Sequence, residues 1–341
     1  MNLIDQDKVV FAVLDSLSAF NMGCYGYDRD TTPFLDSLAE NNLVFDFAYS
    51  NAPWTVPSHA SIFSGDLPEV HGSTSKNMNF ESDSFIQDLS CDTLLMSHNP
   101  LVSETLGFDK GFDEVWEGND IIVNARYGES RAWEETDTDS GFIEMSKQLV
   151  LNSLKYGEPL MPFRIGFNYL KNVKFREGNR GGKMAEDEGG QDLVNLAVNQ
   201  VSGSDDFFLF ANFLETQEYS ATREIYRETG WCNLDYSKAM EIAEKGGVLP
   251  EINEREGRVL RDLYDMQIRY TDSLMKQLYE RIKEEHPDTV FVFTSDHGQN
   301  IQHYEDYTWD HQYAIWERLI RVPLIVAGEN IESDEISENF R

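Results

Sequence analysis

The chain has 341 residues, of which 40% are hydrophobic and 12% aromatic, enough to bury the core of one large domain or two small ones. Its 61 acidic and 28 basic residues give a formal charge of −33, which argues against an extended surface that neutralises nucleic-acid phosphates. The acids are spread along the whole chain and are not blocked into an interaction tail. This pattern favours a folded protein from a high-salt cytoplasm, where salt screens the repulsion.

The cysteines and the N-terminus indicate a reducing compartment. Cys24, Cys91 and Cys232 are an odd number without a CxxC pair, which argues against a disulfide framework. The N-terminal MNLIDQDKVV lacks the basic region and long apolar run of a signal peptide, and no apolar stretch is long enough to span a bilayer. We therefore expect a cytoplasmic protein without a membrane span, while its oligomeric state stays open.

The predicted elements alternate between strands and helices. In chain order they are a strand at 9–14, a helix at 32–41, a strand at 43–49, a loop entering a helix at 53–65, a helix or strand within 86–118, a helix at 192–201, a strand at 207–214, a long helix at 255–283, and strands at 289–293 and 322–326. Several strands are continuous apolar runs, which is typical of strands buried on both faces of a parallel sheet. The alternation predicts a layered α/β fold.

Polar residues follow two of the buried strands. Asp15 comes directly after the first strand, and Asp296-His297 comes just after the strand at 289–293. Ligands of open parallel sheets gather outside the carboxyl ends of the strands. Two carboxylates and an imidazole suit a divalent metal, and the imidazole makes an all-oxygen calcium site less natural. The alternative is that both aspartates cap loops or helices, and spacing alone does not separate the two interpretations.

The segment PWTVPSHASIFSG contains a second candidate. Thr55 precedes Pro57 by two residues, so it could be the N-cap of a helix. The same position would place its hydroxyl beside the amides that favour an anion, and a metal would activate it as a nucleophile. His59 lies one turn later and shares that face, unless it is a surface histidine. His311 lies in a histidine-rich segment further along the chain.

Three long segments carry a family resemblance. They are VVFAVLDSLSAFNMGCYGYDRDTTPFLDSLAENNLVFDFAYSNAPWTVPSHASIFSG, LYDMQIRYTDSLMKQL followed by VFVFTSDHGQN, and DHQYAIWERLIRVPLIV, and LGFDKGFDEVW agrees with them. In order and spacing they resemble the sulfatase family of the alkaline phosphatase superfamily. The resemblance implies an α/β fold: an alkaline phosphatase-like three-layer sandwich with a largely parallel central sheet. Residues 1–341 would form one catalytic domain, with an insertion at 119–200 and the family's C-terminal subdomain absent or truncated.

The resemblance also assigns roles to single residues. Asp15, Asp296 and His297 match metal-binding positions. Thr55 matches the nucleophile, which also contacts the metal. The positions that would hold the oxygens of the substrate are His59, where the motif has arginine, His311, near the substrate anion, and Gln217, where relatives carry histidine. The implied cofactor is one divalent ion: Ca²⁺, Mn²⁺, Mg²⁺ or Zn²⁺.

The implied activity is hydrolysis of a sulfate or phosphate ester on a small, sugar-linked or lipid-linked molecule, through a covalent intermediate on Thr55. Three departures from the family pattern matter: Thr55 replaces the Cys or Ser that becomes formylglycine, Ser16 replaces a second aspartate, and Gln217 cannot act as a general acid. Threonine resembles the phosphodiesterase and phosphoglycerol-transferase branches. The alternatives are therefore a phosphoryl-group transferase and a non-catalytic relative that binds metal or anions.

Overall fold

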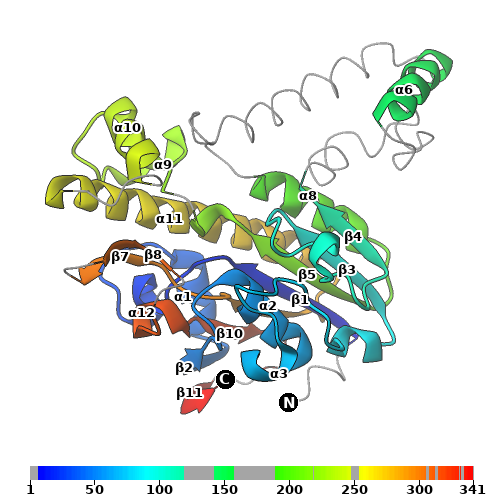
Figure 1. Cartoon of the computed structure of the whole chain (residues 1–341), viewed down its shortest axis with the longest axis horizontal. Coiled ribbons are helices and arrows are strands. Elements are labelled where there is room, and N and C mark those ends of the chain that lie inside the picture. The colour runs from blue at the N-terminus through cyan, green and yellow to red at the C-terminus, as the bar shows by residue number, and fades with distance from the viewer. Residues whose placement is uncertain are drawn as a thin grey trace.

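The computed structural model describes residues 7–118, 142–156, 189–217, 219–246, 253–304, 307–311, 314–329, 331 and 334–340. Its centre is a nine-stranded sheet in the order β11-β2-β10-β6-β1-β5-β3-β4, with β9 paired to β2 (Figure 1). The strands are β1 Lys8–Leu14, β2 Leu43–Tyr49, β3 Asp92–Ser97, β4 Glu114–Glu117, β5 Phe207–Phe213, β6 Val290–Thr294, β9 Arg321–Val322, β10 Leu324–Ala327 and β11 Asp334–Phe340. A separate hairpin joins β7 Asn300–Tyr304 to β8 Tyr307–Asp310.

The middle of the sheet is parallel. Strand β1 pairs in parallel with β5 on one side and with β6 on the other, and β3 pairs in parallel with β4 and β5. Strand β10 is antiparallel to both of its neighbours, β2 and β6. The predicted α/β fold with a largely parallel sheet is therefore confirmed, and the parallel strands end at one common edge.

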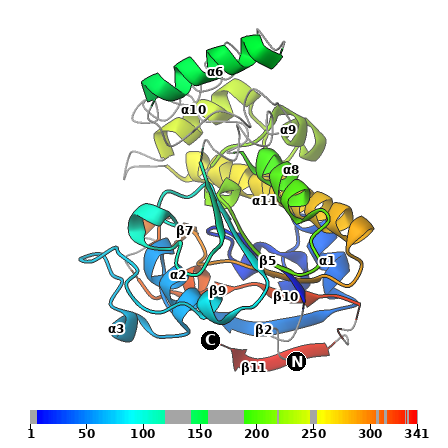
Figure 2. The same ribbon diagram turned by 90° about the vertical axis from the view of Figure 1, so that its right-hand side faces the viewer.

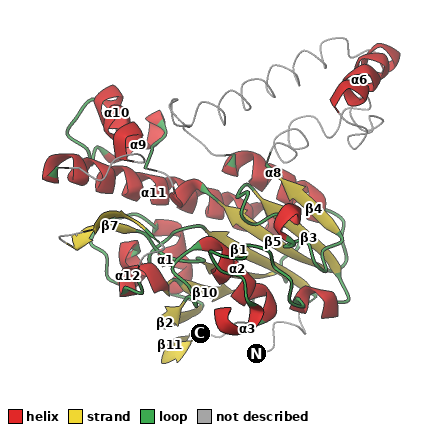
Figure 3. Cartoon of the chain, viewed as in Figure 1, coloured by secondary structure: helices red, strands yellow, loops and turns green. Residues whose placement is uncertain are grey.

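Helices cover both faces of the sheet, which makes three layers (Figures 2 and 3). The helices are α1 Pro33–Ala39, α2 Thr55–Ser64, α3 Pro68–His71, α6 Phe142–Tyr156, α8 Gly190–Val201, α9 Arg223–Thr229, α10 Tyr236–Gly246, α11 Glu254–Glu285 and α12 Glu317–Ile320. Strand β1 shows the division, because Val10, Ala12 and Leu14 pack in one core with α8 and α11, while Val9 and Val13 pack in a second core with α2. This alternation explains why the strand is apolar throughout.

The structure refines two predicted elements. The expected strand at 322–326 is two strands, β9 and β10, separated by Pro323, which has no amide hydrogen to donate to a ladder. Residues 86–118, which the sequence pattern left open, contain the short 3-10 helix Phe85–Asp88 and strands β3 and β4. Most of the predicted insertion lies outside the described residues. Among the helices that the structure describes, none is both long and apolar enough to cross a membrane.

Candidate active site

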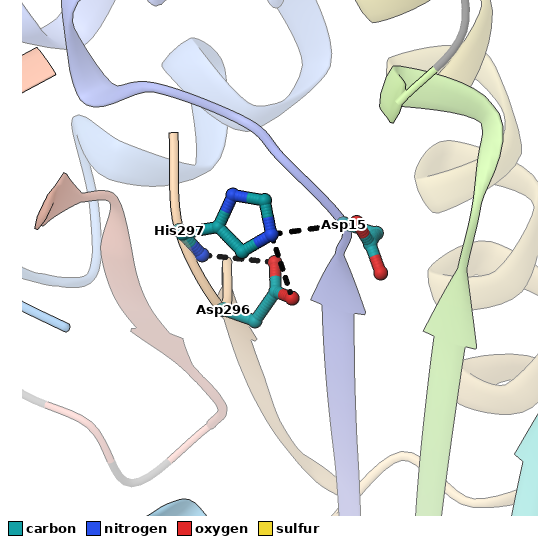
Figure 4. Close-up of side chains that lie close together, drawn as sticks. All are labelled: Asp15, Asp296 and His297. Carbon is teal, nitrogen blue, oxygen red and sulfur yellow. Dashed lines mark hydrogen bonds and ion pairs between the residues drawn. The ribbon is translucent and has the colours of Figure 1, made fainter. Parts of the chain in front are cut away.

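Three candidate metal ligands meet at the common edge of the sheet. Asp15 directly follows β1, and Asp296 and His297 follow the adjacent strand β6. Their ligand atoms all lie within 4.8 Å of one another, and the three side chains have no exposed surface. Figure 4 shows one ring nitrogen of His297 directed toward both carboxylates. The sequence-based expectation that these positions converge agrees with this geometry.

The imidazole of His297 presents one nitrogen to this cluster. Its Nδ1 donates to the carbonyl of Gly298 at 2.9 Å, so the lone pair of the neutral ring lies on Nε2. From Nε2 the distance is 3.3 Å to Asp296 Oδ2 and 4.0 Å to Asp15 Oδ1. Thr55 Oγ1 is 3.4 Å from the same nitrogen. Ligands of one ion at bond lengths of about 2.1 Å are roughly 3–3.5 Å apart. The distances to Asp296 and Thr55 fall in this range, and the distance to Asp15 is longer.

Hydrogen bonds orient the two carboxylates. Asp296 Oδ1 accepts the backbone amides of Ser16 at 3.0 Å and His297 at 2.8 Å. Asp15 accepts Asn99 Nδ2 at 2.7 Å on Oδ2 and the Ser16 hydroxyl at 3.1 Å on Oδ1. Asn99 was not among the predicted site residues, although it follows β3 just as Asp15 follows β1. Asp296 Oδ2 accepts no hydrogen bond from the described part of the chain, so it is available for a cation.

The electrostatics of the pair also favour a cation. Burial, followed by repulsion from Asp296, raises the pKa of Asp15 to about 7. Burial likewise raises the pKa of Asp296 to about 7. Within the described ranges, no Lys or Arg forms an ion pair with either carboxylate. Two buried carboxylates without a basic partner are costly when ionised, and a bound divalent ion offsets that cost. The residues present therefore fit a divalent metal.

Thr55 is the first residue of α2 and not its N-cap, so the capping interpretation is wrong. The N-cap is Trp54, whose backbone is extended and whose side chain makes no capping hydrogen bond. The Thr55 side chain points instead toward His297 and is 1% exposed. Ser58 connects α2 to the loop that follows β6, because its hydroxyl donates to the carbonyl of Asp296 at 2.6 Å. The threonine hydroxyl thus lies at a helix N-terminus beside the candidate metal ligands.

His59 lies behind the threonine. Its Nδ1 donates to the Thr55 carbonyl at 3.0 Å and is 3.6 Å from Asp296 Oδ2. The ring has no exposed surface and packs edge-on against three phenylalanines: Phe63, Phe108 and Phe210. Burial lowers its pKa to about 3, so the ring is neutral. This geometry differs from the expected contact with substrate oxygens and also excludes a surface histidine.

His311 lies next to the cluster, with its ring centroid 4.4 Å from that of His297. Gln299 donates to the Tyr219 hydroxyl at 2.7 Å through Nε2, so its Oε1 accepts the Nδ1–H of His311 at 2.9 Å. The lone pair of His311 is therefore on Nε2. Burial, with a smaller effect of His297, lowers its pKa to about 3, so the ring is neutral.

Gln217 ends the short 3-10 helix Glu215–Gln217 that follows β5. Its neighbour Thr216 donates through its hydroxyl to the carbonyl of Asp15, which places this turn beside the cluster. The Gln217 side chain is half-buried. The predicted site residues are therefore carried by the ends of β1, β5 and β6, by α2 and by the segment after β8.

Comparison with known proteins gives the family. A family model described as Sulfatase matches residues 7–341, so the chain belongs to the sulfatase family. An N-acetylglucosamine-6-O-sulfatase of Bacteroides thetaiotaomicron is 28% identical over 107 residues, which are 30% of this chain and 19% of that protein. The segments matched in three curated relatives span only 16%, 19% and 12% of those proteins.

Solved structures share the fold. The phosphonate monoester hydrolase of Agrobacterium radiobacter has a TM-score of 0.64 at 13% identity, over 98% of this chain and 71% of that one. A zinc complex of the C-terminal periplasmic domain of EptC from Escherichia coli has a TM-score of 0.58 at 14% identity, over 97% and 75% of the two chains. At these identities the likeness shows the architecture, and the ligand set of this chain has to be argued from its own residues.

Proposed function

We propose that this member of the sulfatase family is a metal-dependent hydrolase of esters with a single negative charge, with Thr55 as its nucleophile. The observation that carries the proposal is the position of the Thr55 hydroxyl: it lies 3.4 Å from His297 Nε2, at the N-terminus of α2, beside two buried carboxylates. Amides at such a terminus favour an anion. Four side chains would hold the ion: Asp15, Thr55, Asp296 and His297.

A bound divalent ion would lower the pKa of the threonine hydroxyl and neutralise charge on the group that is transferred. The Thr55 oxygen would lose its proton and form a bond to phosphorus or sulfur, while the bond to the leaving alcohol breaks and the alcohol takes up a proton. Water would then release the group from Thr55. His311 would orient that water through Nε2, because Gln299 holds the proton of the neutral ring on Nδ1, and the proton of the water would pass to the Thr55 oxygen as its bond to the group breaks.

His59 would hold the backbone of the nucleophile. Its Nδ1–H donates to the carbonyl of Thr55, in the first turn of α2, and Nδ1 is 3.6 Å from Asp296 Oδ2. A neutral ring adds no charge to the site. In this role His59 would orient Thr55, and Gln217 would be the side chain that donates to a substrate oxygen.

The charge of the site supports a monoanionic substrate. A divalent ion with two ionised aspartates has no net charge, and His59 and His311 are neutral. A phosphate monoester would bring two negative charges into this site, whereas a phosphate diester or a sulfate monoester brings one. Threonine is not the Cys or Ser from which sulfatases form formylglycine, so we place phosphate diesters first and sulfate monoesters second.

The test is a hydrolysis assay in high KCl with Mn²⁺, using bis-nitrophenyl phosphate, nitrophenyl phosphate and nitrophenyl sulfate. We expect turnover of the diester and a loss of at least about 10³-fold in Thr55→Ala. Thr289→Ala is the matched control, because Thr289 is equally buried and bonds only a local carbonyl, that of His286, at 2.9 Å. Turnover that survives in Thr55→Ala would refute the nucleophile assignment. Turnover of the sulfate alone would reverse the order of substrates.

Two alternatives make different predictions in the same assay. A transferase would form product faster when an acceptor alcohol is added, because the alcohol replaces water in the second step. A non-catalytic relative would bind Mn²⁺ without turnover of any ester.

A further inference from the structure

Ser16 has an unusual backbone conformation beside the site. Its φ of 67° makes it the one non-glycine residue with positive φ in the described part of the chain. For a residue with a Cβ this left-handed conformation is sterically unfavourable. It persists only where the surrounding structure determines it.

That conformation lets Ser16 join the two candidate carboxylate ligands. Its amide donates to Asp296 Oδ1 at 3.0 Å, and its hydroxyl donates to Asp15 Oδ1 at 3.1 Å. The amide occupies Oδ1 of Asp296 and leaves Oδ2 toward the imidazole of His297. A change in the Ser16 backbone would therefore move ligand atoms that come from two different strands.

One tyrosine hydroxyl forms hydrogen bonds with the backbone of Ser16 and of Ser18. Tyr264, in the first half of α11, has no exposed surface. Its hydroxyl donates to the Ser16 carbonyl at 2.7 Å and accepts the Ser18 amide at 3.3 Å. Burial raises the pKa of this phenol, so it stays protonated and remains a donor. Tyr264 belongs to a 32-residue helix, which packs on the face of the sheet opposite to α2.

We propose that Tyr264 is a positioning residue for the metal: it holds Ser16 in the left-handed conformation, and Ser16 in turn holds the ligand oxygens of Asp15 and Asp296. The inference rests on the proposed metal site and adds a residue that touches neither the metal nor the substrate. Tyr264→Phe keeps the ring in the core and removes both hydrogen bonds, so the loop relaxes and the ligand atoms lose their preset spacing.

A matched control separates this role from ordinary core packing. Tyr25 also bridges two backbone groups with its hydroxyl, donating to the Phe45 carbonyl at 3.2 Å and accepting the Leu324 amide at 3.0 Å. These partners belong to β2 and β10 and not to the site. Tyr25→Phe should lower the unfolding temperature as Tyr264→Phe does, without changing metal affinity.

The experiment titrates the full-length chain with Mn²⁺ and follows the electron paramagnetic resonance signal of the unbound ion. We expect Tyr264→Phe to raise the Kd for Mn²⁺ about tenfold and Tyr25→Phe to leave it unchanged. In a Ser16→Gly background, glycine adopts positive φ without strain, so the effect of Tyr264→Phe should shrink to threefold or less.

Four results would overturn the inference. An unchanged Kd in Tyr264→Phe, or an equal rise in Tyr25→Phe, refutes the positioning role while leaving the metal site intact. A full tenfold effect in the Ser16→Gly background shows that the tyrosine does not act through the Ser16 conformation. If the wild-type chain binds no Mn²⁺, the proposed function fails and this inference fails with it.

Discussion

Affinity for a divalent metal should rise steeply between pH 6 and pH 8. Burial raises the pKa of both Asp15 and Asp296 to about 7, and a metal must displace any proton they hold. At pH 6 each carboxylate is ionised in about a tenth of the molecules, and at pH 8 in about nine-tenths. The change is about tenfold for each carboxylate, so we expect the Kd for Mn²⁺ to fall by on the order of 100-fold.

The metal-free protein should show the opposite trend in stability. A raised pKa means that the folded chain holds protons that the unfolded chain has already released, so the free energy of unfolding decreases as pH rises from about 4 to about 7. Each carboxylate accounts for on the order of 4 kcal/mol over this range, and a bound metal offsets the loss.

The assay measures the Kd for Mn²⁺ at half-unit pH steps in one high concentration of KCl. Asp272→Asn is the control, because the pKa of Asp272 is also raised to about 7 by burial, although this residue accepts the amides of Phe34 and Leu35 at the start of α1. Its removal should leave the pH dependence of binding unchanged. A Kd that changes less than threefold from pH 6 to pH 8 would refute the reasoning that two buried carboxylates bind the ion.

Three further predictions concern the supports of the site and the acidic surface. Asn99→Leu removes the 2.7 Å hydrogen bond to buried Asp15, so chemical denaturation of the metal-free protein should show a loss of ~1.5–3 kcal/mol, and a loss below 0.5 kcal/mol would contradict it. The pKa of His59 is lowered to about 3, so the contribution of this residue to stability is lost as pH falls through 6.5. In urea unfolding, His59→Gln should therefore raise the free energy of unfolding at pH 5, relative to its value at pH 7, by about 2 kcal/mol compared with the unmodified chain. An unchanged difference between the two pH values would show that the ring does not titrate on unfolding. With a formal charge of −33, the chain should need molar KCl to fold, and full circular dichroism in dilute buffer would refute the predicted high-salt adaptation.

The sequence predicted the central strands well because those strands are buried on both faces. In β1, β5 and β6 every position meets either a helix or a neighbouring strand, so the apolar runs coincide with the strands to within one residue. Helix α11 was equally readable, since its apolar residues recur at helical spacing and its N-cap Asn253 forms a capping box with Glu256. Strand β10 lies antiparallel to both of its neighbours. The direction of this strand could not be predicted, because an apolar run has the same composition in either direction.

The supports of the site were less predictable than its ligands. Polar residues after buried strands pointed to Asp15 and Asp296, but the same pattern at Asn99 carried no motif that would single it out. The direction in which His59 points depends on the three phenylalanine rings that enclose it, and those rings come from segments far apart in the sequence. The positive φ of Ser16 could not be inferred, because serine is not a residue type that signals this conformation.

At Ser16, where the family resemblance implies a second aspartate, the contacts of the serine support the proposed site and not its decay. Its hydroxyl and amide bind the two remaining carboxylates, so the position still organises the cluster. A third carboxylate in the same buried space would give the metal-loaded site a net negative charge. With two carboxylates and neutral histidines the loaded site has none, which matters in a chain whose surface already repels anions through a formal charge of −33. Under the proposed function, the loss of one carboxylate would therefore remove an electrostatic barrier to the anionic ester that Thr55 would attack.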